Sequence, residues 1–226
     1  MSASVSVLLV EDDDVIRRTL AMALSRYGYG VATAGDGLAG LEMFRRATPD
    51  LLLLDVMLPG LDGIGLCRRI RESSTCPILM MSARGESLDV VAGLEAGADD
   101  YVTKPVDTSV LVARIRSVLR RAGYRDDSGP AGGALAFGDL VIDTGALEVT
   151  VGGEPVALTP TELRLLLEFA ANAGLVLDRS TLLRTVWDYG WDGDSRVVDL
   201  CVQRLRRKIG AQRIETVRGF GYKLRP

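Results

Sequence analysis

The sequence predicts two domains: a doubly wound α/β domain with a five-stranded parallel sheet, followed by an α+β domain. Three observations lead to this fold class. Up to residue 122, short apolar runs alternate five times with helix-length amphipathic segments, as in a parallel sheet covered on both faces. A stretch without periodicity, rich in Gly, Ser, Pro and Asp, occupies 123–134 and predicts a flexible linker. Residues 135–226 begin with hairpin signals and continue with three helical segments.

Each element follows from its local pattern. In the first domain, 1–122, apolar runs predict strands at 5–10, 29–34, 51–54, 77–81 and 99–103, and amphipathic segments predict helices at 14–27, 37–47, 63–72, 85–96 and 107–121. In the second domain, Asp143-Thr144-Gly145 and Gly152-Gly153 predict hairpins. A capping box from Thr159 to Glu162 opens a helix that runs to about residue 173. Further helices are expected at 180–187 and 196–209, and a terminal hairpin around 219–221.

Composition excludes several classes of protein. The chain has no histidine, which removes Ser-His-Asp and Cys-His catalysis, histidine metal sites and phosphohistidine chemistry within it. Cys67, Cys76 and Cys201 are odd in number and never at C-x-x-C spacing, which predicts reduced core thiols. No apolar run reaches the length of a membrane span and the start has no basic leader, so we expect a cytoplasmic protein that does not contact membranes.

Polar residues stand at the carboxyl ends of four predicted parallel strands. These residues are Glu11, Asp12, Asp55, Ser82 and Lys104. Because ligands of doubly wound sheets bind outside the carboxyl ends of the strands, we expect the five side chains to converge. Three carboxylates brought together call for a cation, and oxygen ligands suit Mg²⁺. One carboxylate could then act as the nucleophile toward a phosphoryl group, with the lysine and the serine binding its oxygens.

The motifs around these residues resemble the receiver domain of two-component response regulators. They are VEDD at 10–13, LLLLDVMLPGLDG at 51–63, MMSAR at 80–84 and DDYVTKP at 99–105. The resemblance implies strand order 2-1-3-4-5, a sensor histidine kinase as phosphodonor, and a Lys104–Pro105 bond that is commonly cis. It also implies a role for each pocket residue: Asp55 as phosphoacceptor, Glu11, Asp12, Asp55 and the Met57 carbonyl around Mg²⁺, Ser82 and Tyr101 as a switch pair, and Lys104 as an ion-pair partner.

Two other interpretations of these residues stay open. Taken singly, each pocket residue has a structural explanation: Glu11 and Asp12 could cap the first helix, for example. Residues 35–40 also fit G-x-G-x-x-G between a strand and a helix, which is typical of dinucleotide-binding enzymes. That motif follows the second predicted strand, however, and it leaves four pocket residues unexplained: Glu11, Asp12, Ser82 and Lys104. The glycines then form a tight turn into the second helix.

The second domain resembles the winged-helix effector of OmpR/PhoB-type regulators. The similarity lies in LTPTELRLLLEF, LLRTVW, SRVVDLCVQRLRRKIG and ETVRGFGYKL. Residues 196–226 carry nine basic and two acidic residues, which favours a polyanion partner. The resemblance implies double-stranded promoter DNA, with the 196–209 helix in the major groove. We expect Arg204 to contact bases, Arg196, Gln203, Arg206 and Arg207 to contact phosphates, and Arg218 to enter the minor groove.

The resemblance also implies a homodimer on phosphorylation. Residues expected on the pairing face are Val90, Asp99, Asp100, Val110, Arg114, Arg120 and Arg121. Val90 and Val110 replace a Lys and a Glu that family members often carry, which predicts an apolar contact in place of an ion pair. The acidic loop at 187–195 matches the transactivation loop by position, with RNA polymerase as its family partner. The chain is thus interpreted as a response regulator and not an enzyme; the alternative is a constitutive DNA-binding regulator with an unused receiver.

Overall fold

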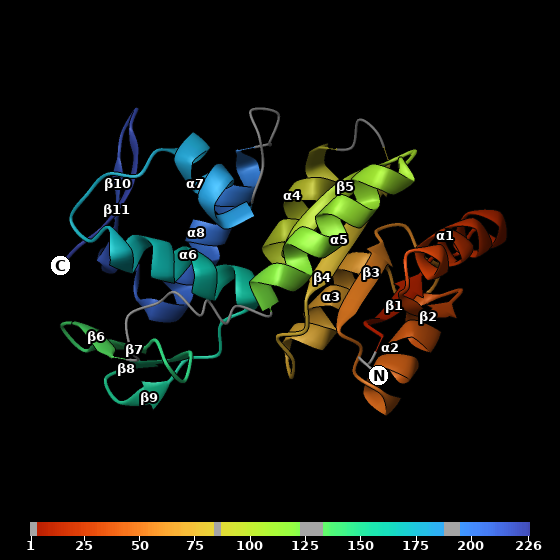
Figure 1. Cartoon of the computed structure of the whole chain (residues 1–226), viewed down its shortest axis with the longest axis horizontal. Helices are drawn as coiled ribbons and strands as arrows, with labels where there is room; N and C mark the ends of the chain where they lie inside the picture. Colours follow the sequence, from red (N-terminus) through yellow and green to blue (C-terminus); the bar gives the residue numbers. More distant parts are fainter. Residues whose placement is uncertain (1–3, 84–86, 123–132, 188–194) are drawn as a thin grey trace. The chain divides into compact units, whose positions relative to one another are not determined.

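The chain divides into two compact units, Met1–Arg120 and Arg121–Pro226 (Figure 1). The computed structural model describes residues 4–83, 87–122, 133–187 and 195–226. The boundary between the units falls two residues before the one expected from the sequence. Most of the expected linker at 123–134 lies outside the described residues, and Ala134 already begins a strand. Among the residues described, no helix combines the length and the apolar character that a membrane span needs.

The first unit is a five-stranded parallel sheet with helices on both faces, as predicted. The strands are hydrogen-bonded in the order β2-β1-β3-β4-β5. In chain order the elements are β1 (Ser6–Val10), α1 (Asp14–Arg26), β2 (Gly30–Ala34), α2 (Gly37–Arg46), β3 (Leu51–Asp55), α3 (Gly63–Arg71), β4 (Ile78–Ala83), α4 (Ser87–Ala96), β5 (Asp100–Lys104) and α5 (Thr108–Ala122). Each predicted helix and strand is present, with ends that shift by one or two residues where they are described.

Alternate side chains of the strands build two cores. On one face, Val7 and Leu9 of β1 and Leu51 and Leu53 of β3 are buried in one cluster with residues of α1 and α5. The other face is covered by α2, α3 and α4 (Figure 1). Because both faces of the sheet are covered, every residue of β3 is buried. This explains why its sequence from Leu51 to Leu54 is apolar without interruption.

The strands run further toward their carboxyl ends than the apolar runs predict. β3 includes Asp55, β4 extends to Ala83 and β5 ends at Lys104. The reason is backbone pairing: Asp55 is in register with Met81, and Ala83 with Lys104. Asp55 and Lys104 therefore occupy the last positions of their strands, and Ser82 the last position but one of β4. Strand pairing fixes the directions of these side chains more firmly than a loop would.

The G-x-G-x-x-G segment is explained by packing. Asp36 is the N-cap of α2 and its side chain accepts a hydrogen bond from the backbone N–H of Ala39 at 2.8 Å. A Cβ on Gly37 would lie 1.9 Å from the carbonyl oxygen of Leu61, and one on Gly40 would lie 2.9 Å from Val10. The two glycines let α2 approach β1 and the loop between β3 and α3. Neither has a positive φ, so close packing of the helix, and not the expected tight turn, accounts for them.

In its described residues, the second unit contains an antiparallel sheet, three α-helices and a terminal hairpin. Its elements are β6 (Ala134–Phe137), β7 (Leu140–Asp143), β8 (Glu148–Val151), β9 (Glu154–Pro155), α6 (Pro160–Ala171), α7 (Arg179–Trp187), α8 (Arg196–Ile209), a 3-10 turn (Ala211–Arg213), β10 (Ile214–Val217) and β11 (Gly221–Leu224). The predicted capping box is present: Thr159 donates its backbone N–H to Glu162, and Glu162 donates its own to Thr159 Oγ1. β10 and β11 form the terminal hairpin.

Candidate functional site

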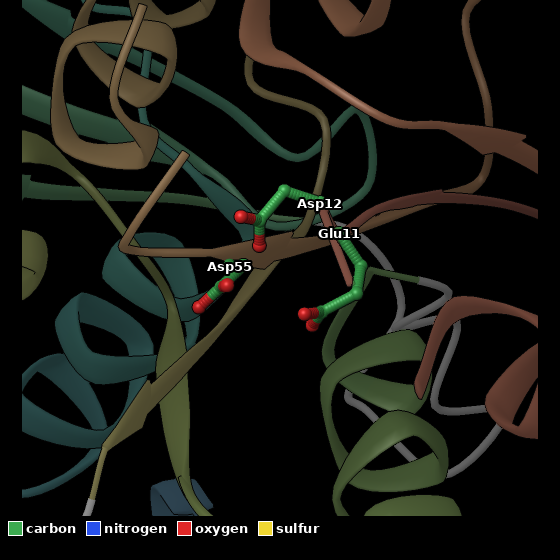
Figure 2. A group of neighbouring side chains, drawn as sticks. All are labelled: Glu11, Asp12 and Asp55. Carbon is green, nitrogen blue, oxygen red and sulfur yellow. The ribbon is translucent and has the colours of Figure 1, made fainter. Parts of the chain in front are cut away.

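Three carboxylates meet at the carboxyl edge of the parallel sheet. Glu11 and Asp12 follow β1, Asp55 ends β3, and one oxygen from each lies within 4.8 Å of the others. Figure 2 shows the three side chains next to one another at this edge. Glu11 and Asp55 are buried, whereas Asp12 is exposed. The residue that caps α1 is Asp13, which accepts hydrogen bonds from the N–H groups of Val15 and Ile16. The capping alternative for Glu11 and Asp12 is therefore wrong.

Lys104 reaches into the same cluster from the end of β5. Its Nζ lies 2.7 Å from Glu11 Oε2 and 2.8 Å from Asp55 Oδ2. Burial raises the pKa of Glu11, although the hydrogen bond from Lys104 opposes this. Burial would by itself lower the pKa of Lys104, but its hydrogen bonds to Asp55 and Glu11 outweigh burial and the pKa is raised. The ammonium group is thus charged and shared between two carboxylates.

Ser82 supplies a hydroxyl group that is ready for a ligand. It lies on β4, is 1% exposed, and its Oγ has no hydrogen-bond partner among the described residues. Leaving a buried hydroxyl without a partner costs free energy, so such atoms in native proteins call for an explanation. Tyr101, expected to act with Ser82, is half-buried on β5. Lys104–Pro105 is a cis peptide bond, as the resemblance implied.

The donor set suits a hard divalent cation. Mg²⁺ prefers carboxylate and carbonyl oxygens, and Glu11, Asp12 and Asp55 offer three carboxylates. Met57 lies two residues after Asp55, and its side chain is 62% exposed. The end of the loop that carries it can pass close to β3 because residue 63 is a glycine: a Cβ there would lie 2.0 Å from the carbonyl oxygen of Asp55. The residues present therefore fit the metal that the sequence predicts.

The basic helix α8 presents only part of its charge to solvent. Val198, Cys201, Val202, Leu205 and Ile209 are buried, as the helical spacing predicts. Arg196, Gln203 and Arg207 are exposed. In the hairpin that follows, Arg218 is exposed and Phe220 is 70% exposed. Lys208 is exposed as well, so four polar residues of α8 and the tip of the hairpin reach solvent in the part of the effector that the structure describes.

Arg204 does not lie on the exposed face of α8, which corrects our expectation. Its side chain is 8% exposed, and its Nε lies 3.2 Å from Oε1 of Glu162 on α6. Helical spacing puts position 204 at the border between the apolar face of α8 and the face that carries Gln203 and Arg207. A buried carboxylate on the neighbouring helix draws its guanidinium group inward, since an unpaired buried charge is costly.

Arg206 is also engaged within the unit, contrary to the expected phosphate contact. It donates hydrogen bonds to the carbonyl oxygen of Ile214 at 2.6 and 2.9 Å and to Thr216 Oγ1 at 2.7 Å. Its guanidinium carbon lies 5.5 Å from the ring centre of Tyr222. Arg206 therefore connects α8 to the terminal hairpin. Its guanidinium group donates hydrogen bonds to β10 and lies over the ring of Tyr222 on β11.

Comparisons with known proteins identify the family. Residues 7–116 match the model for the response regulator receiver domain, and 153–224 match that for the C-terminal domain of transcriptional regulatory proteins. The chain is 62% identical to the transcriptional regulatory protein CseB of Streptomyces avermitilis over the whole of both chains. The chain belongs to the OmpR/PhoB family of response regulators. It is also 54% identical to the transcriptional regulatory protein AfsQ1 of Streptomyces coelicolor, over 98% of each chain.

Two solved structures are similar to the chain over its full length. A point mutant of RitR has a TM-score of 0.77 at 27% identity, covering 98% of this chain and 99% of its own. DrrB of Thermotoga maritima, an OmpR/PhoB homolog, has a TM-score of 0.50 at 32% identity, covering 99% and 100%. Membership of the family gives the two units their names, receiver and effector. It implies a histidine kinase as phosphodonor and DNA as the effector's ligand.

The residues expected on the pairing face are placed differently from one another. Val110 on α5 is 49% exposed, whereas Val90 on α4 is 5% exposed. Asp100 lies 3.5 Å from Arg114 of the same chain. Arg120 is exposed and Arg121 is buried. Val90, Asp100 and Arg121 are thus buried, which corrects our expectation that these three side chains lie on an exposed face. A pairing face that includes Val110, Arg114 and Arg120 stays a prediction.

The expectation that Asp99 lies on the pairing face is wrong. Its Oδ2 accepts hydrogen bonds from Arg71 Nη2 at 2.9 Å and from the N–H of Ile78 at 3.0 Å, and it is 2% exposed. It is thus bound inside the receiver, at the amino ends of β4 and β5. Arg71 also donates to the carbonyl oxygens of Gly97 and Cys76. No spacing in the sequence signals this cluster, because Arg71 and Asp99 are 28 residues apart.

The acidic loop that we expected to contact RNA polymerase falls mostly on residues 188–194, which lie outside the described part of the chain. Trp187, at its start, is fully buried.

Proposed function

We propose that this response regulator receives a phosphoryl group on Asp55 from a sensor histidine kinase, pairs through its receiver, and binds promoter DNA as a dimer. The observation that carries the proposal is the Lys104 ammonium group shared between Glu11 and Asp55, with Asp12 beside them. A buried carboxylate with a fixed cation at its side is suited to nucleophilic attack on a charged phosphoryl group.

In the transfer, the P–O bond to Asp55 forms while the P–N bond to the kinase histidine breaks, and the imidazole, protonated on its other nitrogen, leaves neutral. Glu11, Asp12, Asp55 and the Met57 carbonyl would hold Mg²⁺, and the ion would supply positive charge for the phosphoryl oxygens when bound. Lys104 exchanges part of its contact with Asp55 for a phosphoryl oxygen. The hydroxyl of Ser82 donates to another oxygen, which gives this buried group a partner, and Tyr101 moves in behind it.

Phosphorylation then shifts the receiver toward its pairing conformation. In the effector, Arg196, Gln203 and Arg207 approach DNA from α8, and Arg218 from the hairpin. Guanidinium and amide groups suit both base edges and phosphates. RNA polymerase is a further proposed partner, through the loop after Trp187.

The test uses the full chain with Mg²⁺ and a small acyl phosphate. We expect the wild type to gain one phosphoryl group by intact mass and then to enrich directly repeated half-sites from random duplexes. Asp55→Asn should do neither. Asp36→Asn is the matched control, because asparagine caps a helix as well as aspartate does, so this variant should behave as wild type.

Two results would contradict the proposal. An Asp55→Asn protein that still gains a phosphoryl group would place the acceptor elsewhere. A variant that is not phosphorylated but selects the same duplexes as the phosphorylated wild type would favour the alternative, a constitutive DNA-binding regulator.

A further inference from the structure

Glu162 is a buried carboxylate with more partners than a capping residue needs. It is 1% exposed at the third position of α6. Its Oε2 accepts the backbone N–H of Thr159 at 2.9 Å, which completes the capping box. The same oxygen lies 2.7 Å from Nζ of Lys208, and Oε1 lies 3.2 Å from Nε of Arg204. Both cations belong to α8, so a single side chain joins the start of α6 to the basic helix.

The spacing of the two cations makes this contact directional. Arg204 and Lys208 are four residues apart and therefore lie on the same side of α8, one turn above the other. Two bonds from successive turns to one carboxylate restrict both the rotation of α8 about its axis and its displacement along α6. Buried ion pairs contribute little net stability, and in some proteins their role is to select one arrangement over others. The arrangement favoured here leaves Gln203 and Arg207 exposed.

We propose that Glu162 is a positioning residue for DNA recognition, which sets the orientation of α8 by holding Arg204 and Lys208. The inference rests on the proposed DNA-binding function of the effector. Sequence discrimination then falls to the outward side chains, Gln203 and Arg207, and Arg204 acts through Glu162. The contacts with Glu162 lie on a different side of α8 from Gln203 and Arg207. Losing them changes the orientation of α8, which weakens contacts with base edges more than contacts with phosphates, because phosphate contacts tolerate displacement.

The experiment compares Glu162→Gln with Glu168→Gln in the full chain, with Mg²⁺ and acyl phosphate. Glutamine keeps the capping box but removes the charge that holds the two cations. Glu168 is a matched control on the same helix, because its backbone carbonyl and its carboxylate accept hydrogen bonds from Asn172 at the end of α6. Binding is measured for the duplex that the wild type selects and for a scrambled duplex of the same composition.

We expect Glu162→Gln to lower the ratio of the two affinities by about tenfold, a typical coupling within one charged network. The scrambled duplex should bind as before, because phosphate contacts dominate that binding. Glu168→Gln should keep the wild-type ratio. In the double variant Glu162→Gln/Arg204→Gln, the ratio should fall no further than in the single variant, since both changes break the same contact.

An unchanged ratio for Glu162→Gln, or an equal loss on both duplexes, would overturn the proposal. So would an Arg204→Gln variant that changes the preferred base at one position, because Arg204 would then contact DNA itself. If Glu162→Gln does not fold, Lys208→Gln removes one of the two cations from a side chain that is 33% exposed, and the same fall in the ratio is expected. A wild type that selects no duplex would instead refute the DNA-binding function.

Discussion

The thiol of Cys76 in the receiver shows how burial makes a side chain unreactive. Burial raises its pKa to about 12, and its Sγ donates to the carbonyl oxygen of Pro49 at 3.2 Å. Cys67 and Cys201 are buried as well, and all three cysteines are thiols rather than disulfides. Since the thiolate is the reactive form, a high pKa and burial together make a thiol inert.

We therefore expect no cysteine of the folded protein to react rapidly with a thiol-specific reagent at pH 8. In denaturant, all three should react. The measurement is a thiol titration followed by mass spectrometry of the labelled peptides. Rapid labelling of Cys76 in the folded chain would mean that its burial is incomplete in solution.

For single residues, the acidic pocket of the receiver could be predicted from the sequence more completely than the exposed face of α8. Glu11, Asp55 and Lys104 each stand at the end of a strand of a parallel sheet, so topology alone brings them together. Arg204 lies near the border of two helix faces, and its direction depends on Glu162, which is 42 residues away in the sequence. Helical spacing gives the face of a residue to within about one position, and that is too coarse where a buried counter-charge decides.

Helix α7 shows how a single cap defines an element. It begins at Arg179, one residue before the predicted start. Asp178 accepts hydrogen bonds from the N–H of Thr181 and from the hydroxyl groups of Ser180 and Thr181. These bonds, led by that from Ser180, lower the pKa of Asp178 from 3.8 to about 2. A lowered pKa stabilises the fold above pH 3.8, and this contribution is lost as the pH falls toward 2.

Replacing Asp178 with alanine should lower the free energy of unfolding of the effector by about 1 kcal/mol at pH 7, as for other N-caps. The difference from wild type should shrink as the pH falls below 3.8. Tryptophan fluorescence reports the effector transition, because Trp187 and Trp191 are the two tryptophans of the chain. Glu154→Ala, at an exposed carboxylate of the same unit, is the control. A loss that stays constant from about pH 7 to about pH 2.5 would contradict the role of the ionised carboxylate.

For the whole molecule, the proposed dimer depends on the surface around β5 and α5. A pocket of about 290 Å³ opens there, lined by Val110, Tyr101 and Arg114 among others. Val110 is half exposed and lines this pocket together with Tyr101, the proposed switch residue. An apolar contact at this position would couple pairing to the state of Tyr101, and it would not be screened by salt.

We expect the phosphorylated dimer to lose little affinity as salt rises from about 0.05 to about 1 M, a range over which the Debye length shrinks several-fold. Val110→Ala should weaken the dimer about tenfold, since trimming the side chain in both copies removes ~1.4 kcal/mol of apolar burial. Analytical ultracentrifugation with Mg²⁺ and acyl phosphate measures the dimer dissociation constant across the salt range and for the Val110→Ala variant. Steep weakening by salt would show that ion pairs dominate the interface.

The sequence by itself determined the two domains, the strand and helix positions, the acidic pocket and the family, because these depend on local periodicity, caps and motifs. Only the tertiary structure decided which basic residues of α8 face outward, that Asp99 is bound by Arg71, and that the buried hydroxyl of Ser82 has no partner within the described part of the chain. The physical reason is burial: removing a charge from water forces it to find a counter-charge wherever the fold provides one. That partner is set by packing between distant segments, which no local pattern in the sequence records.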